Sequence, residues 1–128
     1  CLILMTYCLD KPIFKMKNLI PLLLFIACVQ EKPKINLIEK QEFQEKISQD
    51  VQLIDVRTPE EYVGGYIGTA ININYNAPDF KRQISKLDRD KPVLIYCAAG
   101  GRSAKASKVF DSLGFNTIYD LKGGYRSW

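Results

Sequence analysis

The sequence predicts an α/β fold in which helices cover both faces of a parallel sheet. Short apolar segments alternate along the chain with segments of helix length, and this order is typical of βαβ units. Residues 92–96 are apolar and uncharged, as expected of a central parallel strand that is buried on both faces. The 128 residues are enough for one domain with its own core.

Five segments are predicted strands, because each is short, mostly apolar and bounded by charged or turn-forming residues. The second ends near Asp55, and three glycines, Gly64, Gly65 and Gly68, separate the third from the helix before it. The predicted strands are residues 36–38, 51–56, 70–73, 92–96 and 116–119.

Two of the predicted helices are amphipathic. Residues 40–48 carry Phe43 and Ile47 four positions apart, which places both side chains on one face of a helix. Residues 103–113 carry four apolar side chains at helical spacing. Gly114 follows and is predicted to end that helix.

Two shorter helices are predicted between the second and fourth strands. Thr58 is a candidate N-cap, and Pro59 suits the first turn of a helix that runs through Tyr62. Residues 79–87 place three apolar side chains on one face, which predicts the other helix.

The composition excludes several kinds of site. A formal charge of +4 is too small to indicate nucleic-acid binding, and the basic residues do not cluster. The absence of histidine excludes Ser-His-Asp and Cys-His catalysis and most zinc sites. We therefore expect neither a metal nor another cofactor. The cysteines contain no CxxC pair; they are Cys1, Cys8, Cys28 and Cys97.

Residues 1–27 are predicted to be upstream residues and a signal peptide. A lysine precedes the nine apolar or neutral residues 19–27, which are too few to cross a bilayer, since crossing takes about 20 residues. The run from Phe25 to Cys28 is similar to the lipobox of bacterial lipoproteins, although Phe25 stands where the pattern prefers Leu. This resemblance implies that Cys28 is lipidated and becomes the mature N-terminus.

We therefore expect a protein of the bacterial cell envelope, lipid-anchored to a membrane and lying outside the cytoplasmic membrane on its periplasmic side. Residues 28–34 are predicted to be a short polar tether, and residues 35–128 the folded domain. A plain cleaved signal or a buried apolar helix would also account for residues 19–27.

Cys97 is the candidate catalytic residue. It directly follows the predicted strand 92–96, and parallel sheets bind ligands at the carboxyl ends of their strands. Small residues and two glycines lead from it to Arg102, so that the backbone can curl and point successive N–H groups at an anion. With the N-terminus of the next helix, these groups can stabilise a thiolate without a histidine. The alternative is a packed structural cysteine.

Four motifs in order resemble those of single-domain rhodaneses. The loop from Cys97 to Ser103, with the sequence CAAGGRS, is similar to their C-x-x-G-x-R-S active loop. Residues 53–62 resemble the D-V-R-x-x-x-E-[FY] signature, residues 68–73 the G-A-[IV]-N-[IL] strand, and residues 121–128 the closing G-G-[WY]-x-x-W.

The resemblance implies a single rhodanese-like domain with a five-stranded parallel sheet and a ping-pong sulfurtransferase reaction. Cys97 would take the outer sulfur of a small anion such as thiosulfate as a persulfide, and pass it to a thiol acceptor or to cyanide. The loop backbone would bind the terminal sulfur, and Arg102 would attract the donor. The binding residues implied are Ala98, Ala99, Gly100, Gly101, Arg102 and Ser103.

Asp55 and Arg57 lie on the strand end or turn next to this loop and are predicted to support it. We expect Arg57 to pair with Glu60 or Glu61, and Asp55 to anchor loop backbone. Paired charges near a site are more often scaffolding than chemistry.

Two other functions share parts of the pattern. Cysteine phosphatases and arsenate reductases use a similar anion cradle, but their loop is C-x5-R, sized for a tetrahedral oxyanion, whereas this chain has C-x4-R. A persulfide carrier or sulfur-relay module needs the same residues as the enzyme and differs only in its acceptor.

Overall fold

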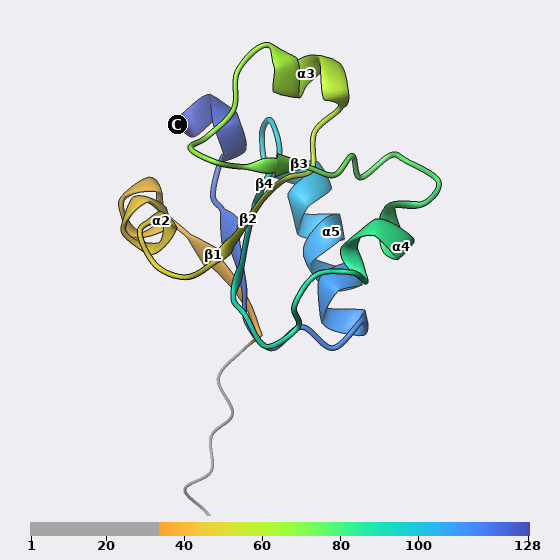
Figure 1. Ribbon diagram of the computed structural model, residues 1–128. Coiled ribbons are helices and arrows are strands. Elements are labelled where there is room, and N and C mark those ends of the chain that lie inside the picture. Colours follow the sequence, from red (N-terminus) through yellow and green to blue (C-terminus); the bar gives the residue numbers. More distant parts are fainter. Residues whose placement is uncertain (1–33) are drawn as a thin grey trace, which may run out of the picture. The chain divides into compact units, whose positions relative to one another are not determined.

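Five parallel strands form one sheet in the order β1-β5-β4-β2-β3. The computed structural model describes residues 34–128, and it confirms the predicted α/β architecture with helices on both faces (Figure 1). The strands are β1 (Ile35–Ile38), β2 (Gln52–Asp55), β3 (Ile71–Asn72), β4 (Val93–Tyr96) and β5 (Ile118–Leu121).

The helices lie on opposite sides of this sheet (Figure 1). On one side lies α2 (Lys40–Ile47), and on the other lie α4 (Phe80–Ile84) and α5 (Gly101–Ser112). The short helix α3 (Pro59–Val63) follows β2, and a 3-10 helix, η1 (Gly124–Ser127), closes the chain.

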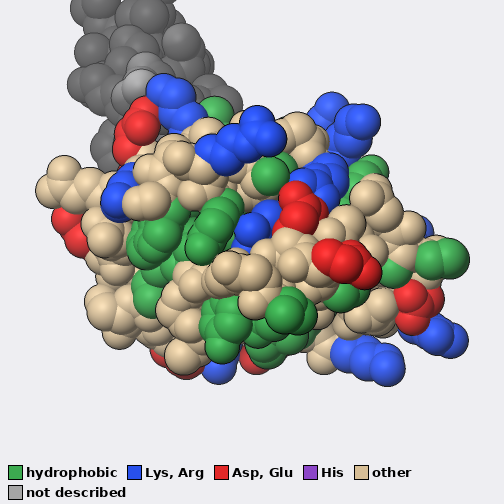
Figure 2. Space-filling model, turned by 90° about the horizontal axis from the view of Figure 1, so that it is seen from above, with side chains coloured by type: hydrophobic (Ala, Val, Ile, Leu, Met, Phe, Trp, Pro, Cys, Tyr) green, Lys and Arg blue, Asp and Glu red, His purple; other side chains and the backbone are tan. Residues whose placement is uncertain are grey.

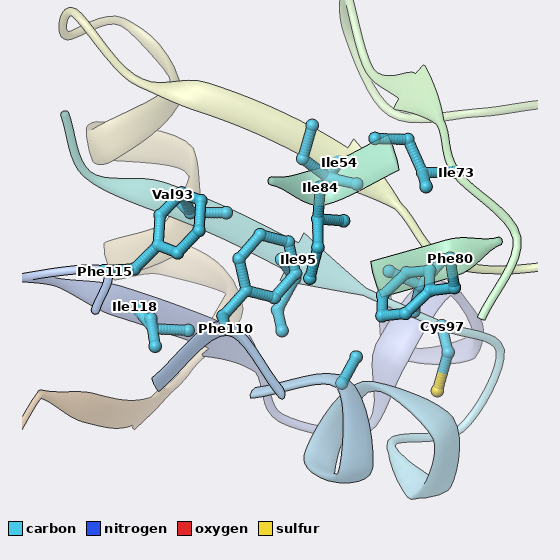
Figure 3. Close-up of a cluster of buried hydrophobic side chains, with 12 residues drawn as sticks. Ile54, Ile73, Phe80, Ile84, Val93, Ile95, Cys97, Phe110, Phe115 and Ile118 are labelled. Carbon is cyan, nitrogen blue, oxygen red and sulfur yellow. The ribbon is translucent and has the colours of Figure 1, made fainter. Parts of the chain in front are cut away.

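Each face of the sheet has its own apolar cluster. On the α4/α5 face, Phe80 and Phe110 pack with Ile95 of the central strand (Figure 3). On the α2 face, Phe43 packs with Leu94 and Tyr96. Burying an Ile, Leu or Phe side chain stabilises a fold by roughly 1.5–3 kcal/mol relative to exposure, so these clusters hold β4 firmly between two layers.

The predicted helix start at Thr58 is confirmed in detail. The Thr58 hydroxyl accepts a hydrogen bond from the Glu61 amide, and the Glu61 carboxylate accepts one from the Thr58 amide. This reciprocal pair is a capping box, which satisfies two amides that the first turn leaves without helical partners.

Several predicted boundaries were shifted: α5 begins at Gly101 and not at Ser103, and larger parts of the last strand and of the helix predicted over 79–87 differ. The last strand runs over 118–121 and not 116–119, because its register pairs Ile118 with Val93 of β4 and Leu121 with Ile38 of β1. The helix predicted over 79–87 ends at Ile84, and the chain continues in turns whose amides bond three residues back, as Leu87 does to Ile84.

No helix within residues 34–128 is long and apolar enough to cross a membrane. The predictions for the signal peptide, for the lipidation site Cys28 and for all of the tether except its last residue lie outside the described residues.

Candidate active site

Cys97 lies at the carboxyl end of β4, the middle strand of the five. Three residues separate it from α5, which begins at Gly101. The side chain closes one end of the apolar cluster on the α5 face, and its sulfur points toward the start of that helix (Figure 3). The predicted position at a strand's carboxyl end is therefore confirmed.

The sulfur is enclosed by polar groups of its own loop. Only 1% of the residue is exposed. The Gly100 amide donates to Sγ at 3.0 Å, and the Cys97 thiol donates to the Ser103 Oγ at 3.5 Å. Burial raises the pKa of the thiol, but hydrogen bonding with the Ser103 side chain and with the amides of Ser103, Gly100 and Ala99 outweighs it, so the pKa lies below the ordinary value. The loop therefore stabilises the thiolate, which is the reactive form.

The loop backbone is held from behind by the end of the chain. The Tyr125 amide donates to the Cys97 carbonyl at 2.7 Å, and the Arg126 amide donates to the Ala98 carbonyl at 3.0 Å. Gly124 lets the two segments approach, because a Cβ there would lie 2.5 Å from the Cys97 carbonyl oxygen. The closing motif thus sets the position of the cysteine, a role that its sequence did not indicate.

The turn before α5 depends on Gly100. Its φ of +108° is in the region that side-chain-bearing residues rarely adopt. This conformation lets the amide of Gly100 face back toward Sγ while α5 starts at the next residue. Ala99, Gly100 and Ser103 of the predicted binding loop therefore reach the sulfur, whereas Ala98 contributes the carbonyl held by Arg126.

Arg102 pairs with Glu61, one of the two partners predicted for Arg57. Its guanidinium donates two hydrogen bonds to the Glu61 carboxylate, at 2.7 and 2.9 Å. These bonds, with the capping contacts of Thr58, lower the pKa of Glu61 to about 2 despite partial burial. The charge that was predicted to attract an anionic donor is thus neutralised in this conformation.

The prediction that Arg57 pairs with Glu60 or Glu61 was wrong. Arg57 is buried and donates to both carboxylate oxygens of Asp55, with a shortest distance of 2.6 Å. It also donates to the Gly65 carbonyl and lies over the Tyr125 ring, 4.1 Å from the centroid. The prediction failed because Asp55, two residues before Arg57, binds its guanidinium. Glu61 on α3 binds Arg102 instead.

Asp55 and Arg57 nevertheless form a buried, hydrogen-bonded pair. Besides binding the Arg57 guanidinium, the Asp55 carboxylate accepts from the Arg57 amide. Arg57 in turn links the segment after α3, through Gly65, to the closing segment, through Tyr125. The closing segment bonds to the cysteine loop, and the hydrogen bonds of Sγ involve neither Asp55 nor Arg57. Their supporting role stays a prediction.

The face that carries the carboxyl ends of the strands mixes charges of both signs. Figure 2 shows Lys and Arg side chains next to Asp and Glu side chains and to apolar groups, with no uniform basic area.

A model of the Rhodanese-like domain matches residues 39–128. The chain belongs to the rhodanese-like family. The curated thiosulfate sulfurtransferase 16, chloroplastic, of Arabidopsis thaliana is 36% identical over 85 residues, covering 59% of this chain and 71% of that protein. A tRNA uridine(34) hydroxylase of Pelagibacter ubique is 32% identical over 117 residues, which are 89% of this chain but only 38% of that protein.

A solved structure shares the fold as well. The rhodanese-related protein of Thermoplasma volcanium aligns with a TM-score of 0.65 and 35% identity, covering 73% of this rhodanese-like chain and 89% of the other. The family resemblance of the four sequence motifs is thereby confirmed, and relatives named as sulfurtransferases are among those that match.

Proposed function

We propose that this protein is a sulfurtransferase that moves a sulfane sulfur from a donor such as thiosulfate to a thiol or cyanide through a persulfide on Cys97. The observation that carries the proposal is the sulfur itself. It is a buried thiol at the end of the central strand whose pKa is lowered by the amides and hydroxyl of one short loop. An apolar structural cysteine would have its pKa raised by burial instead.

In the first half-reaction the Cys97 thiolate attacks the outer sulfur of thiosulfate. A sulfur–sulfur bond forms to Sγ, the sulfur–sulfur bond of thiosulfate breaks, and sulfite leaves with the electron pair. The new terminal sulfur carries the negative charge and lies where the loop amides can donate to it.

In the second half-reaction the acceptor attacks the terminal sulfur. The bond between that sulfur and Sγ breaks, and Cys97 leaves as the thiolate that the loop already stabilises. Cyanide gives thiocyanate, and a thiolate gives a persulfide.

Intact-mass measurement tests the persulfide. Cys97 is the one cysteine in residues 34–128, so thiosulfate should add a single sulfur atom to that domain, and cyanide or dithiothreitol should remove it. The Cys97→Ser variant should gain no mass. Sulfur addition that persists in this variant would overturn the assignment.

A persulfide carrier would pass the same mass test, and turnover separates it from an enzyme. We expect repeated sulfite release with thiosulfate and a small thiol. A single equivalent of sulfite would instead favour the relay module. Phosphatase chemistry is disfavoured, because the loop is one residue shorter than C-x5-R and Arg102 is bound to Glu61; rapid hydrolysis of p-nitrophenyl phosphate would reverse this ordering.

We further propose that Cys28 carries the lipid that holds the domain outside the cytoplasmic membrane of a bacterial cell. The support is the lipobox-like run before Cys28. In a bacterial host with a lipoprotein pathway, the full chain should incorporate labelled fatty acid and the Cys28→Ala variant should not. A mature form that begins well past Cys28 would contradict the proposal.

A further inference from the structure

A buried carboxyl group lies behind Cys97, and the reaction above does not use it. Asp120 is 3% exposed and sits on β5, where the register pairs it with Ile95 of β4. Successive strand residues alternate between faces, so Asp120, Ile95 and Cys97 all point to the α5 side of the sheet. Figure 3 shows Ile95 and Cys97 on that side.

The Asp120 carboxyl is poorly satisfied for a group buried so deeply. Among the described residues, no donor forms a hydrogen bond with its Oδ1. The Ser103 hydroxyl interacts with the carboxyl but donates its proton to the Gly100 carbonyl at 3.2 Å. Burial raises the pKa of Asp120 to about 6, and the Ser103 hydroxyl opposes part of that rise.

The groups that face Asp120 from neighbouring elements are few. From β4 comes the Cys97 thiol, and from α5 come the buried hydroxyls of Ser103 and Ser107. From β1 comes Leu37, which the register places opposite Asp120. The charged side chains of α5 are exposed or already paired, as Arg102 is with Glu61; the exposed ones are Lys105, Lys108 and Asp111.

Ser103 connects the two acids. Its Oγ accepts from the Cys97 thiol on one side and adjoins the Asp120 carboxyl on the other. Cys97 lies two residues beyond Ile95, the β4 partner of Asp120, and faces the same side of the sheet. Two anions buried on that side of neighbouring strands repel each other, so the second proton leaves the pair less readily than the first.

We propose that Cys97 and Asp120 share one proton through the Ser103 hydroxyl. Asp120 is then a positioning residue that stores the thiol proton inside a site without histidine. The proposal rests on Cys97 as the reacting thiol.

The transfer balances without any further reactant. The Ser103 hydroxyl first turns from the Gly100 carbonyl toward Asp120. The Cys97 sulfhydryl proton then passes to Ser103 Oγ, while the Ser103 hydroxyl proton passes to the Asp120 carboxylate. The products are a thiolate, an intact hydroxyl and a neutral carboxylic acid. The proton returns by the same route when the thiolate is protonated again, so a cysteine with 1% exposure need not exchange protons with bulk water in every cycle.

The test is the number of ionisations that Cys97 shows. Alkylation rate and thiolate absorbance of the wild-type protein, measured from pH 5 to 10, should show two steps, because the first proton leaves a mixture of thiolate and carboxylate forms. The Asp120→Asn variant should show one step, at a pH between the two wild-type steps. Asp111→Asn, which removes an exposed carboxylate from α5, should keep both steps.

Two further measurements keep the test decisive if Asp120→Asn folds poorly. The carboxylic acid band of Asp120, followed by infrared difference spectroscopy, should titrate in two steps in the wild type and in one step in Cys97→Ser, because coupling between two sites is reciprocal. Ser103→Ala should shrink the low-pH step of Cys97. A single Cys97 ionisation that Asp120→Asn does not move would overturn the proposal.

The outcome is separable from that of the proposed function. Two coupled ionisations in a protein that thiosulfate never modifies would support the shared proton and reject the sulfurtransferase. Sulfur transfer with one uncoupled Cys97 ionisation would do the opposite.

Discussion

Glu61 ties the arginine of the cysteine loop to a neighbouring helix, and this contact limits what Arg102 can offer an anionic donor. The bidentate geometry, at 2.7 and 2.9 Å, occupies both terminal nitrogens of the guanidinium. A dianion such as thiosulfate must displace Glu61 or approach an ion pair without net charge. The ion pair therefore weakens the attraction of Arg102 for a dianion more than its attraction for a monoanion.

The Glu61→Gln variant tests this competition. Gln keeps the capping box of α3, because its amide oxygen can still accept from the Thr58 amide. Freeing Arg102 from a partly exposed ion pair is worth up to about 1 kcal/mol, or about fivefold. We therefore expect kcat/KM for thiosulfate to rise about fivefold, and that for the monoanion methanethiosulfonate to rise less.

The neighbouring carboxylate provides the matched control. Glu60 is exposed, carries the same charge and makes no contact with Arg102 among the ion pairs of the described residues. Glu60→Gln should leave the ratio of the two donors unchanged. An equal change in both variants would mean that only the net charge near the site matters, and a fall in thiosulfate activity in Glu61→Gln would mean that the ion pair orients the loop.

At the scale of elements, the strands were predicted better than their connections. Apolar runs flanked by turn residues place β2 and β4 to within two residues, since a buried parallel strand needs little beyond continuous hydrophobicity. The last strand was placed two residues early because Asp120 interrupts its apolar run. A charged residue in a strand is evidence against burial unless the fold encloses it, and only the structure shows that it does.

The part of the site that lies in one continuous loop was predicted from the sequence. The residues that other elements bring to that loop were missed. The residues 97–103 are contiguous, so glycine content and position after a strand were sufficient to find the thiolate loop. Glu61, Asp120 and Gly124 reach the loop from α3, β5 and the closing segment. The capping box marks Glu61 as a helix residue, and no sequence spacing reveals its second bond to Arg102.

The closing segment gives a prediction at this scale. Gly124 has a φ of +63°, and a Cβ there would approach the Cys97 and Ala98 carbonyl groups to between 2.5 and 2.8 Å. Gly124→Ala should therefore push the cysteine loop away from η1. We expect a loss of stability of about 3 kcal/mol in urea unfolding, from backbone strain and the clash together, and a fall in sulfur transfer of at least tenfold.

Gly114→Ala separates strain from contact. Gly114 also has a positive φ, +87°, but a Cβ there would meet nothing within 4 Å. This variant should lose only the contribution of backbone strain, about 1 kcal/mol, and retain sulfur transfer. Equal losses of activity in the two variants would show that η1 does not position the loop.

At the scale of the whole domain, the sheet brings together segments that are distant in the chain. Cys97 follows β4, Asp55 ends β2 and Arg57 follows it, and Asp120 lies on β5. The fold encloses two charged groups at this end, Asp55 and Arg57, which neutralise each other. Asp120 lacks such a partner, and its burial should therefore be visible in the stability of the entire domain.

The pH dependence of unfolding measures that burial. A carboxyl whose pKa is raised from 3.8 to about 6 in the folded state binds its proton more tightly when folded. Its stabilising contribution is complete below about pH 4 and is lost as the pH rises through 6. The expected loss is about 2 to 3 kcal/mol, since each tenfold gain in proton affinity on folding corresponds to about 1.4 kcal/mol. Glu61 has the opposite effect, in a lower pH range. Because its pKa is lowered to about 2, its contribution to stability is lost only as the pH falls below about 4.5.

Urea unfolding of Cys97→Ser and of Cys97→Ser with Asp120→Asn, compared from pH 4 to 8, isolates Asp120 from the titrating thiol. The single variant should lose stability relative to the double variant from pH 4 to about 7, and the difference should then level off, because at higher pH Asp120 is almost fully ionised in both states. Asn has no proton to lose, so the double variant should show only the slope of the remaining groups. A constant difference over the whole range would mean that Asp120 ionises at its ordinary pKa, and that water or a rearranged Ser103 hydroxyl satisfies the buried carboxylate.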